Sequence, residues 1–113
     1  SDLEFKVHTL IKGRGDIVKK GQIVTLHYSG FLYESGNVFD SSWDKGQPTQ
    51  FALADGQLIP GFIKALEGQT VGSQVIAIVP PSDGYGNQEQ GSIPANSTLI
   101  FVVDILGTNN KTN

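Results

Sequence analysis

Most of this chain alternates between apolar and polar residues, and only one stretch has helical spacing. In STLIFVVDIL (residues 97–106), the apolar residues on one face are Leu99, Phe101, Val103 and Ile105. Alternation in a segment rich in β-branched residues predicts a half-buried strand. The same reasoning predicts strands within residues 3–10, 23–33, 38–43, 49–53 and 72–80, with Gly30 as a bulge or bend. A chain of this kind folds mainly as an antiparallel sheet.

The exception is IPGFIKALEG, residues 59–68. Its apolar stripe at helical spacing consists of Ile59, Phe62, Ile63 and Leu66. Pro60 suits the first helical position, and Gly68 suits the stop. One short helix among several strands predicts an α+β fold, a strongly curved antiparallel sheet (a half-barrel) wrapped around the helix. Since no repeat or linker is visible, we expect a single domain over residues 1–113.

Composition excludes several classes of function. The 113 residues carry a net charge of −3, and Lys19-Lys20 is the only basic pair, which argues against binding nucleic acid or an anionic membrane. The run LIFVVDIL is too short to span a membrane and contains Asp104, so no membrane insertion is expected. The absence of cysteine removes thiolate chemistry and suits either redox compartment. We expect a monomer and a frayed tail at residues 107–113.

The usual catalytic and metal-binding patterns are also missing. His8 and His27 fall in predicted strands without the spacing of metal ligands, so each is interpreted as a strand or core histidine. No G-x-S-x-G motif or cofactor motif is present, and the glycine turns GRG and GYG lack a Walker lysine. The carboxylate of Asp40, in VFDSSWD, has no histidine, lysine or cysteine next to it. An acid–base pair is therefore not indicated.

Several aromatic residues lie in or beside predicted turns. They are Phe39, Trp43, Phe62 and Tyr85. Tyr85 belongs to a long polar segment, residues 80–94, and long loops in compact domains often carry function. The N–H of Ile59, just before the helix, has no helical partner and could meet a ligand, water or a turn. From the residues alone, an aromatic-lined pocket and an inert packed loop are equally open.

An ordered set of motifs carries a family resemblance. It consists of HYSGFL (27–32), FDSS (39–42), LIPGF (58–62), VGS (71–73), GYG (84–86) and IPANSTLIFVVDIL (93–106). From about residue 19 to residue 106 the chain resembles the FKBP-type peptidyl-prolyl cis-trans isomerases, immunophilins that bind tacrolimus and rapamycin, and it looks similar to bacterial members. The resemblance implies a bent antiparallel sheet around one helix, with a proline-binding pocket between them.

The resemblance also implies the site residues. The pocket wall would consist of Tyr28, Phe39, Leu58, Ile59, Phe62, Tyr85, Ile93 and Phe101, with Phe62 at the base. Catalysis would involve Asp40, Tyr85, Ile59 and Phe39, with the Ile59 N–H and the Tyr85 hydroxyl as donors to substrate carbonyls. Asp40 is interpreted as an oriented acceptor at the pocket edge, held by its neighbours, with Tyr28 as a candidate partner. For Trp43 we expect a rim or packing role.

Some positions depart from the family pattern. Phe62 replaces a common tryptophan, Lys45 a common arginine and Thr49 a common aromatic residue, and the loop 86–92 is shorter and more polar. These departures bear on catalytic efficiency and on affinity for macrolides, not on proline binding. Two functions stay open: an isomerase acting on proline-containing polypeptides, and a chaperone-like module that binds them without turnover. The bacterial resemblance favours an exported or envelope-tethered parent chain over a cytoplasmic one.

Overall fold

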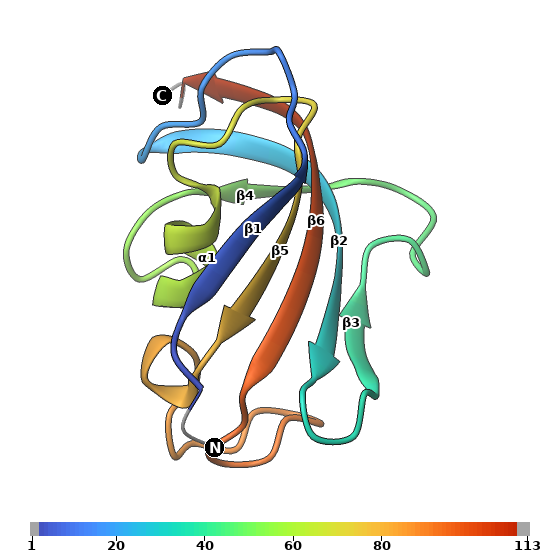
Figure 1. Ribbon diagram of the computed structural model, residues 1–113, viewed down its shortest axis with the longest axis vertical. Helices are drawn as coiled ribbons and strands as arrows, with labels where there is room; N and C mark the ends of the chain where they lie inside the picture. Colours follow the sequence, from blue (N-terminus) through green and yellow to red (C-terminus); the bar gives the residue numbers. More distant parts are fainter. Residues whose placement is uncertain (1–2, 111–113) are drawn as a thin grey trace.

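Six antiparallel strands form one open sheet that bends around a single short α-helix in the part of the chain described by the computed structural model, residues 3–110 (Figure 1). The strand order is β1-β5-β6-β2-β3, and β4 also pairs with β2. This arrangement confirms the predicted α+β fold. The elements are β1 (Lys6–Ile11), β2 (Gln22–Leu32), β3 (Val38–Ser41), β4 (Thr49–Ala52), α1 (Pro60–Leu66), β5 (Gln74–Val79), the 3-10 turn η1 (Pro81–Asp83) and β6 (Leu99–Asn110).

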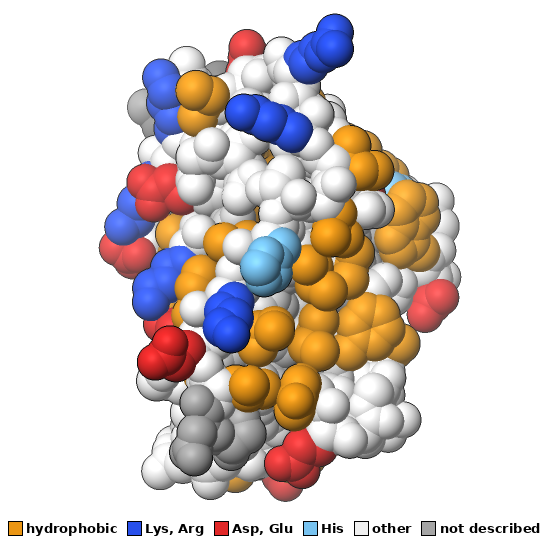
Figure 2. All heavy atoms as spheres, in the orientation of Figure 1, with side chains coloured by type: hydrophobic (Ala, Val, Ile, Leu, Met, Phe, Trp, Pro, Cys, Tyr) orange, Lys and Arg blue, Asp and Glu red, His pale blue; other side chains and the backbone are white. Residues whose placement is uncertain are grey.

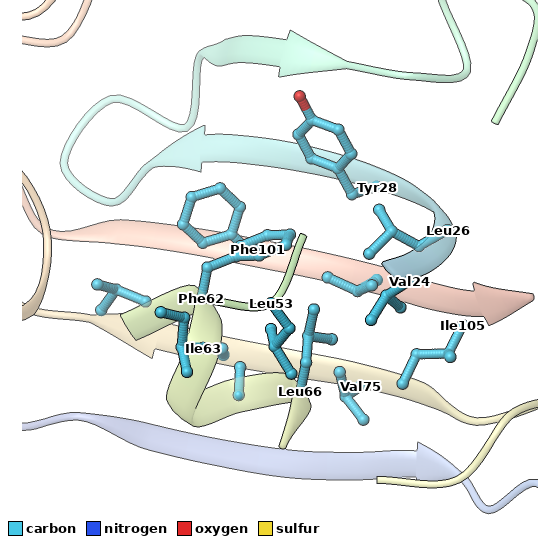
Figure 3. Packing of buried hydrophobic residues seen from close by; sticks show 14 of the residues in the cluster. Val24, Leu26, Tyr28, Leu53, Phe62, Ile63, Leu66, Val75, Phe101 and Ile105 are labelled. Carbon is cyan, nitrogen blue, oxygen red and sulfur yellow. The ribbon is translucent and has the colours of Figure 1, made fainter. Parts of the chain in front are cut away.

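The last strand, β6, lies at the centre of the sheet between β5 and β2. Its four predicted inward residues, from Leu99 to Ile105, are each at most 5% exposed. They pack against Leu26, Leu53 and other buried residues beneath α1 (Figure 3). The alternation of the sequence therefore identifies the core face correctly.

Helix α1 has the ends that its sequence predicts. Pro60 occupies the first turn, where its missing N–H leaves no hydrogen bond unmade, and Ile59 is the N-cap. Gly68 follows the C-cap with φ of +87°, a conformation that side chains with a Cβ disfavour. The apolar stripe faces the sheet, with Phe62, Ile63 and Leu66 buried. This burial, more than intrinsic propensity, stabilises so short a helix.

The outer face of the central strands is also partly apolar. Ile76 and Ile78 on β5 and Ile100 and Val102 on β6 are half-buried there, and Figure 2 shows hydrophobic side chains gathered over these strands. Apolar residues on both faces explain the continuous runs VIAIV and LIFVV.

The run LIFVV lies within strand β6. No helix among residues 3–110 is long and apolar enough to cross a membrane.

The two ends of the chain differ from the sequence expectations. The first strand begins at Lys6, later than residue 3. The tail was expected to fray from residue 107, which is wrong for residues 107–110, because they continue β6 and pair with the start of β2. Side-chain hydrogen bonds reinforce this pairing: the Gln22 amide donates to Asn110 Oδ1 over 3.2 Å, and the Thr108 hydroxyl donates to Gln22 Oε1 over 2.8 Å. Residues 111–113 lie outside the described part.

Candidate proline-binding site

A cavity of about 460 Å³ lies between α1 and the inner face of the sheet. Its lining residues are Tyr28, Phe39, Asp40, Phe51, Gly56, Gln57, Leu58, Ile59, Phe62, Tyr85 and Phe101. Every predicted wall residue except Ile93 is among them. Ile93 is instead buried in the hydrophobic core, at 5% exposure. Residues from β2, β3, β4, β6, α1 and two loops thus converge on one concavity.

Edge-to-face aromatic contacts fix the base of the cavity. Phe62, 4% exposed, contacts Phe101 at a ring-centroid distance of 5.1 Å, Phe51 at 5.7 Å and Tyr28 at 5.9 Å. Figure 3 shows Phe62, Phe101 and Tyr28 directed toward a common region from α1, β6 and β2. Such pairs contribute about 0.5–1.5 kcal/mol each beyond their buried area. The base is a pre-formed apolar surface.

Gly30 makes room for the Phe39 wall. The pairing of β2 with β3 shifts beside Gly30, where Phe39 is the unpaired extra residue of β3. The predicted irregularity at Gly30 is therefore present, but the additional residue belongs to the opposite strand. A Cβ at Gly30 would lie 2.5 Å from Cζ of Phe39, closer than any real contact. Glycine thus lets the Phe39 ring cross β2 and pack edge-on against Phe101, at 5.7 Å between centroids.

We expect Gly30→Ala to displace the Phe39 ring and to lower the free energy of unfolding by about 1–3 kcal/mol, the usual cost of overpacking. Urea denaturation measures the change. The matched control is Gly107→Ala on β6, where the nearest atom to an added Cβ is 4.0 Å away. Equal losses in the two variants would contradict the steric role of Gly30.

Asp40 is held from three directions. The Tyr28 hydroxyl donates a short hydrogen bond to Oδ2, while the Ser41 N–H donates to Oδ1 over 2.9 Å and Lys45 Nζ lies 3.2 Å from the same oxygen. Burial raises the pKa of Asp40, but the hydrogen bonds from Tyr28, Lys45 and Ser41 outweigh burial and leave the pKa below its ordinary value. Asp40 is thus an ionised, oriented carboxylate at neutral pH, in agreement with the sequence interpretation.

Tyr28, the partner of Asp40, gives a pH-dependent prediction. Burial raises the pKa of Tyr28, and the hydrogen bond to Asp40 and the charge of that carboxylate raise it further. Because the pKa is higher in the folded state than in the unfolded one, the neutral hydroxyl stabilises the fold below about pH 10, and this stability is lost as the pH rises above that value. We expect the stability of Tyr28→Phe to fall less steeply than that of the wild type between about pH 9 and 11. Urea denaturation across this range measures the slopes, and equal slopes in the two proteins would contradict the prediction.

Two polar groups of the lining are available to a ligand. Among the hydrogen bonds of residues 3–110, Ile59 takes part only through its carbonyl, which accepts the N–H groups of Phe62 and Ile63. The Tyr85 side chain lines the cavity, and no hydrogen bond of its hydroxyl is found within the same residues. Both groups are the donors that the resemblance implies.

Sequence reasoning did not assign three lining residues to the pocket: Phe51, Gly56 and Gln57. The strand predicted at residues 49–53 alternates in TQFAL, which puts Phe51 and Leu53 on one face, and this pattern is the signal that could have identified Phe51. Gly56 and Gln57 lie in the turn before α1, where periodicity carries no information. The histidines lie elsewhere: His8 is exposed on β1, and His27 contacts Ser42. Residues 3–110 contain no group of three or more His, Asp or Glu placed to hold a metal ion.

Comparisons with known proteins identify the family to which this fold and cavity belong. The chain belongs to the FKBP-type peptidyl-prolyl cis-trans isomerases, because the model of that family matches residues 15–106. A probable FKBP-type peptidyl-prolyl cis-trans isomerase of Haemophilus influenzae is 42% identical over 112 residues, which cover 98% of this chain and 44% of that protein. An FK506-binding protein of Streptomyces anulatus is 35% identical over 105 residues, which cover 91% and 85% of the two chains.

Solved structures agree with the family assignment. The crystal structure of FkpA from Escherichia coli matches with a TM-score of 0.87 at 33% identity, covering 94% of this chain and 48% of that one. That of AtFKBP13 matches with a TM-score of 0.84 at 29% identity, covering 93% of each chain. The chain also spans only 46% of FK506-binding protein 2 from Gibberella zeae. It therefore corresponds to about half the length of several of its relatives.

Proposed function

We propose that this chain catalyses cis–trans isomerisation of Xaa-Pro bonds in polypeptides, with the proline ring in the aromatic cavity. The observation that carries the proposal is the convergence of Phe39, Phe62 and Phe101 on one concavity that also contains an oriented carboxylate. Proline is apolar, and its ring suits such a surface. The family match over residues 15–106 supports the same reaction.

The reaction needs no acid–base pair. Rotation about the amide breaks no covalent bond, and its barrier of about 18–20 kcal/mol is the loss of amide resonance. A twisted amide is less dipolar than a planar one, so an apolar and water-poor cavity favours the twisted form. Every 1.4 kcal/mol of this preference accelerates rotation about tenfold.

Each polar group then has a positional role. The Ile59 N–H and the Tyr85 hydroxyl donate to the carbonyl groups that flank the proline and hold them while the amide turns. Asp40 provides a fixed negative charge at the cavity edge, and Phe39 closes the wall next to it. Leu58 completes the apolar lining. None of these roles requires a proton to be transferred.

An exchange assay on an Ala-Leu-Pro-Phe peptide, coupled to a protease or followed by NMR, tests the proposal. We expect acceleration that decreases in Tyr85→Phe, which removes one donor and keeps the ring. Peptide binding without acceleration would instead identify a binding module that lacks turnover. Product from an ester or peptide bond would indicate a hydrolase, which we do not expect.

Several further properties are part of the same proposal. We expect the chain to act as a monomeric single domain over residues 1–113, supported by one core cluster that draws residues from β2, β5, β6 and α1. Macrolides of the tacrolimus type are candidate ligands, because relatives are named FK506-binding proteins. Competition between such a macrolide and the peptide tests shared occupancy of the cavity. The extracytoplasmic location of the parent chain stays a prediction.

A further inference from the structure

Ser42 is a fully buried hydroxyl residue in the turn that follows β3. Its backbone N–H donates to the Tyr28 carbonyl over 3.0 Å, and its Oγ accepts the Tyr28 N–H over 2.7 Å. Ser42 therefore binds both the N–H and the carbonyl of Tyr28, the residue whose hydroxyl donates to Asp40. Since Asp40 precedes Ser42 by only two residues, these contacts close a ring that links Tyr28, Asp40 and Ser42.

The Ser42 hydroxyl has a third partner, Nδ1 of His27, at 2.8 Å. A hydroxyl has one proton, which it can give either to this nitrogen or to the Tyr28 carbonyl, 3.3 Å away. Neutral His27 with an unprotonated Nδ1 accepts that proton. Protonated His27 donates to Oγ instead, so the Ser42 proton turns to the Tyr28 carbonyl. The state of His27 thus decides the hydrogen bonding around Tyr28.

Trp43 covers the imidazole. The rings of Trp43 and His27 stack at a centroid distance of 3.7 Å and an angle of 12°, and Trp43 as a whole is 55% exposed. The stack fixes the plane of the imidazole and so directs Nδ1 at Ser42. This geometry gives the tryptophan of VFDSSWD a role outside the cavity.

Charged groups near His27 come from two elements. Asp104 lies opposite His27 in the register of β6 and accepts a hydrogen bond from the Gln74 amide over 3.1 Å. The turn after β3 carries Asp44 and Lys45, and Lys45 pairs with Asp40. β4 (TQFA) has no titratable residue.

We propose that Ser42 and His27 are positioning residues for the Tyr28–Asp40 pair, and that Trp43 holds His27 in place for that role. This inference rests on the proposed isomerase function, because it concerns residues that orient the Asp40 carboxylate at the cavity edge. Neither residue lines the cavity. They act through Tyr28.

Two substitutions of His27 separate hydrogen bonding from packing. His27→Asn retains an acceptor near the position of Nδ1, whereas His27→Phe keeps a ring to stack on Trp43 and loses the hydrogen bond. We expect kcat/KM to fall about three- to tenfold in His27→Phe and in Ser42→Ala, as is usual for one lost hydrogen bond, and to stay within about twofold of the wild type in His27→Asn. The reverse order of the two His27 variants would overturn the proposal, because only packing would then matter.

A measurement without substrate distinguishes failure of the inference from failure of the proposed function. The carboxyl carbon of Asp40 can be followed by NMR during an acid titration. We expect its midpoint to rise in Ser42→Ala and His27→Phe, because a displaced Tyr28 hydroxyl stabilises the carboxylate less, and to stay unchanged in His27→Asn. Equal midpoints in all four proteins would overturn the inference even in an active enzyme. A wild type without isomerase activity would overturn the proposed function, while this titration still decides whether the residues are coupled.

Discussion

Replacing Phe62 with alanine is expected to lower the free energy of unfolding by about 3–5 kcal/mol and to abolish most of the isomerase activity. Phe62 is 4% exposed and contacts Tyr28, Phe51 and Phe101 edge to face, so truncation removes three aromatic contacts and leaves a void at the base of the cavity. The surrounding rings belong to three strands and cannot collapse into the void without distorting the sheet. This is the largest stability effect that we expect.

Urea denaturation measures the change in stability, and the exchange assay measures activity at a denaturant concentration where both proteins stay folded. Phe62→Leu, which keeps most of the volume, should lose clearly less stability than Phe62→Ala. Tyr33→Ala, at a 45% exposed aromatic position, serves as the surface control. A loss below about 1 kcal/mol in Phe62→Ala would contradict the central role of this ring in the core.

Replacing Asp40 with leucine is expected to reduce kcat/KM by a factor on the order of 10 to 100. Hydrogen bonds to a charged group contribute about 1.5–3 kcal/mol, and every 1.4 kcal/mol corresponds to a factor of ten. The substitution removes the fixed charge and also leaves the Tyr28 hydroxyl without its acceptor. The Tyr28 side chain is then no longer held in one orientation on the cavity wall. The apolar leucine side chain keeps the cavity edge filled.

Asp44→Leu is the matched control, because Asp44 lies in the turn that follows β3, is exposed and does not line the cavity. We expect it to retain full activity. Asp40→Asn separates charge from shape, since it retains an acceptor for Tyr28 and loses the ion pair with Lys45. Full activity in Asp40→Leu would remove Asp40 from the catalytic set.

The sequence predicted the architecture well because the signals for it are local. Strict alternation identified the buried face of β6, and the single stripe of helical spacing identified α1 with its proline and glycine ends. The prediction of a frayed tail was wrong for residues 107–110, because their structure depends on a long-range contact. Gly107, Asn109 and Asn110 have poor strand propensity, but β2 extends far enough to pair with them, and such a tertiary partner is invisible in a local window.

Only part of the candidate site could be predicted from local sequence patterns. Most of the lining came from the family resemblance, since convergence of residues from several separate elements cannot be worked out from spacing. Ile93, which the motif resemblance assigns to the wall, is buried in the same core as Phe62 and Phe101 but is not among the lining residues. The bond from Tyr28 to Asp40 depends on the register of β2 with β3, which the bulge at Phe39 sets.

The central position of β6 has a consequence for how the chain reaches its native state. The strand that joins both halves of the sheet is the last of the described strands to be synthesised, and its partners in β2 lie 67 to 88 residues earlier, from Leu32 opposite Leu99 to Gln22 opposite Asn110. Contacts between such distant segments form slowly, because a long loop has to close before they are gained. Nascent chains that lack β6 should therefore remain without a stable sheet, exposing the inner edges of β2 and β5 to chaperones until β6 has been synthesised.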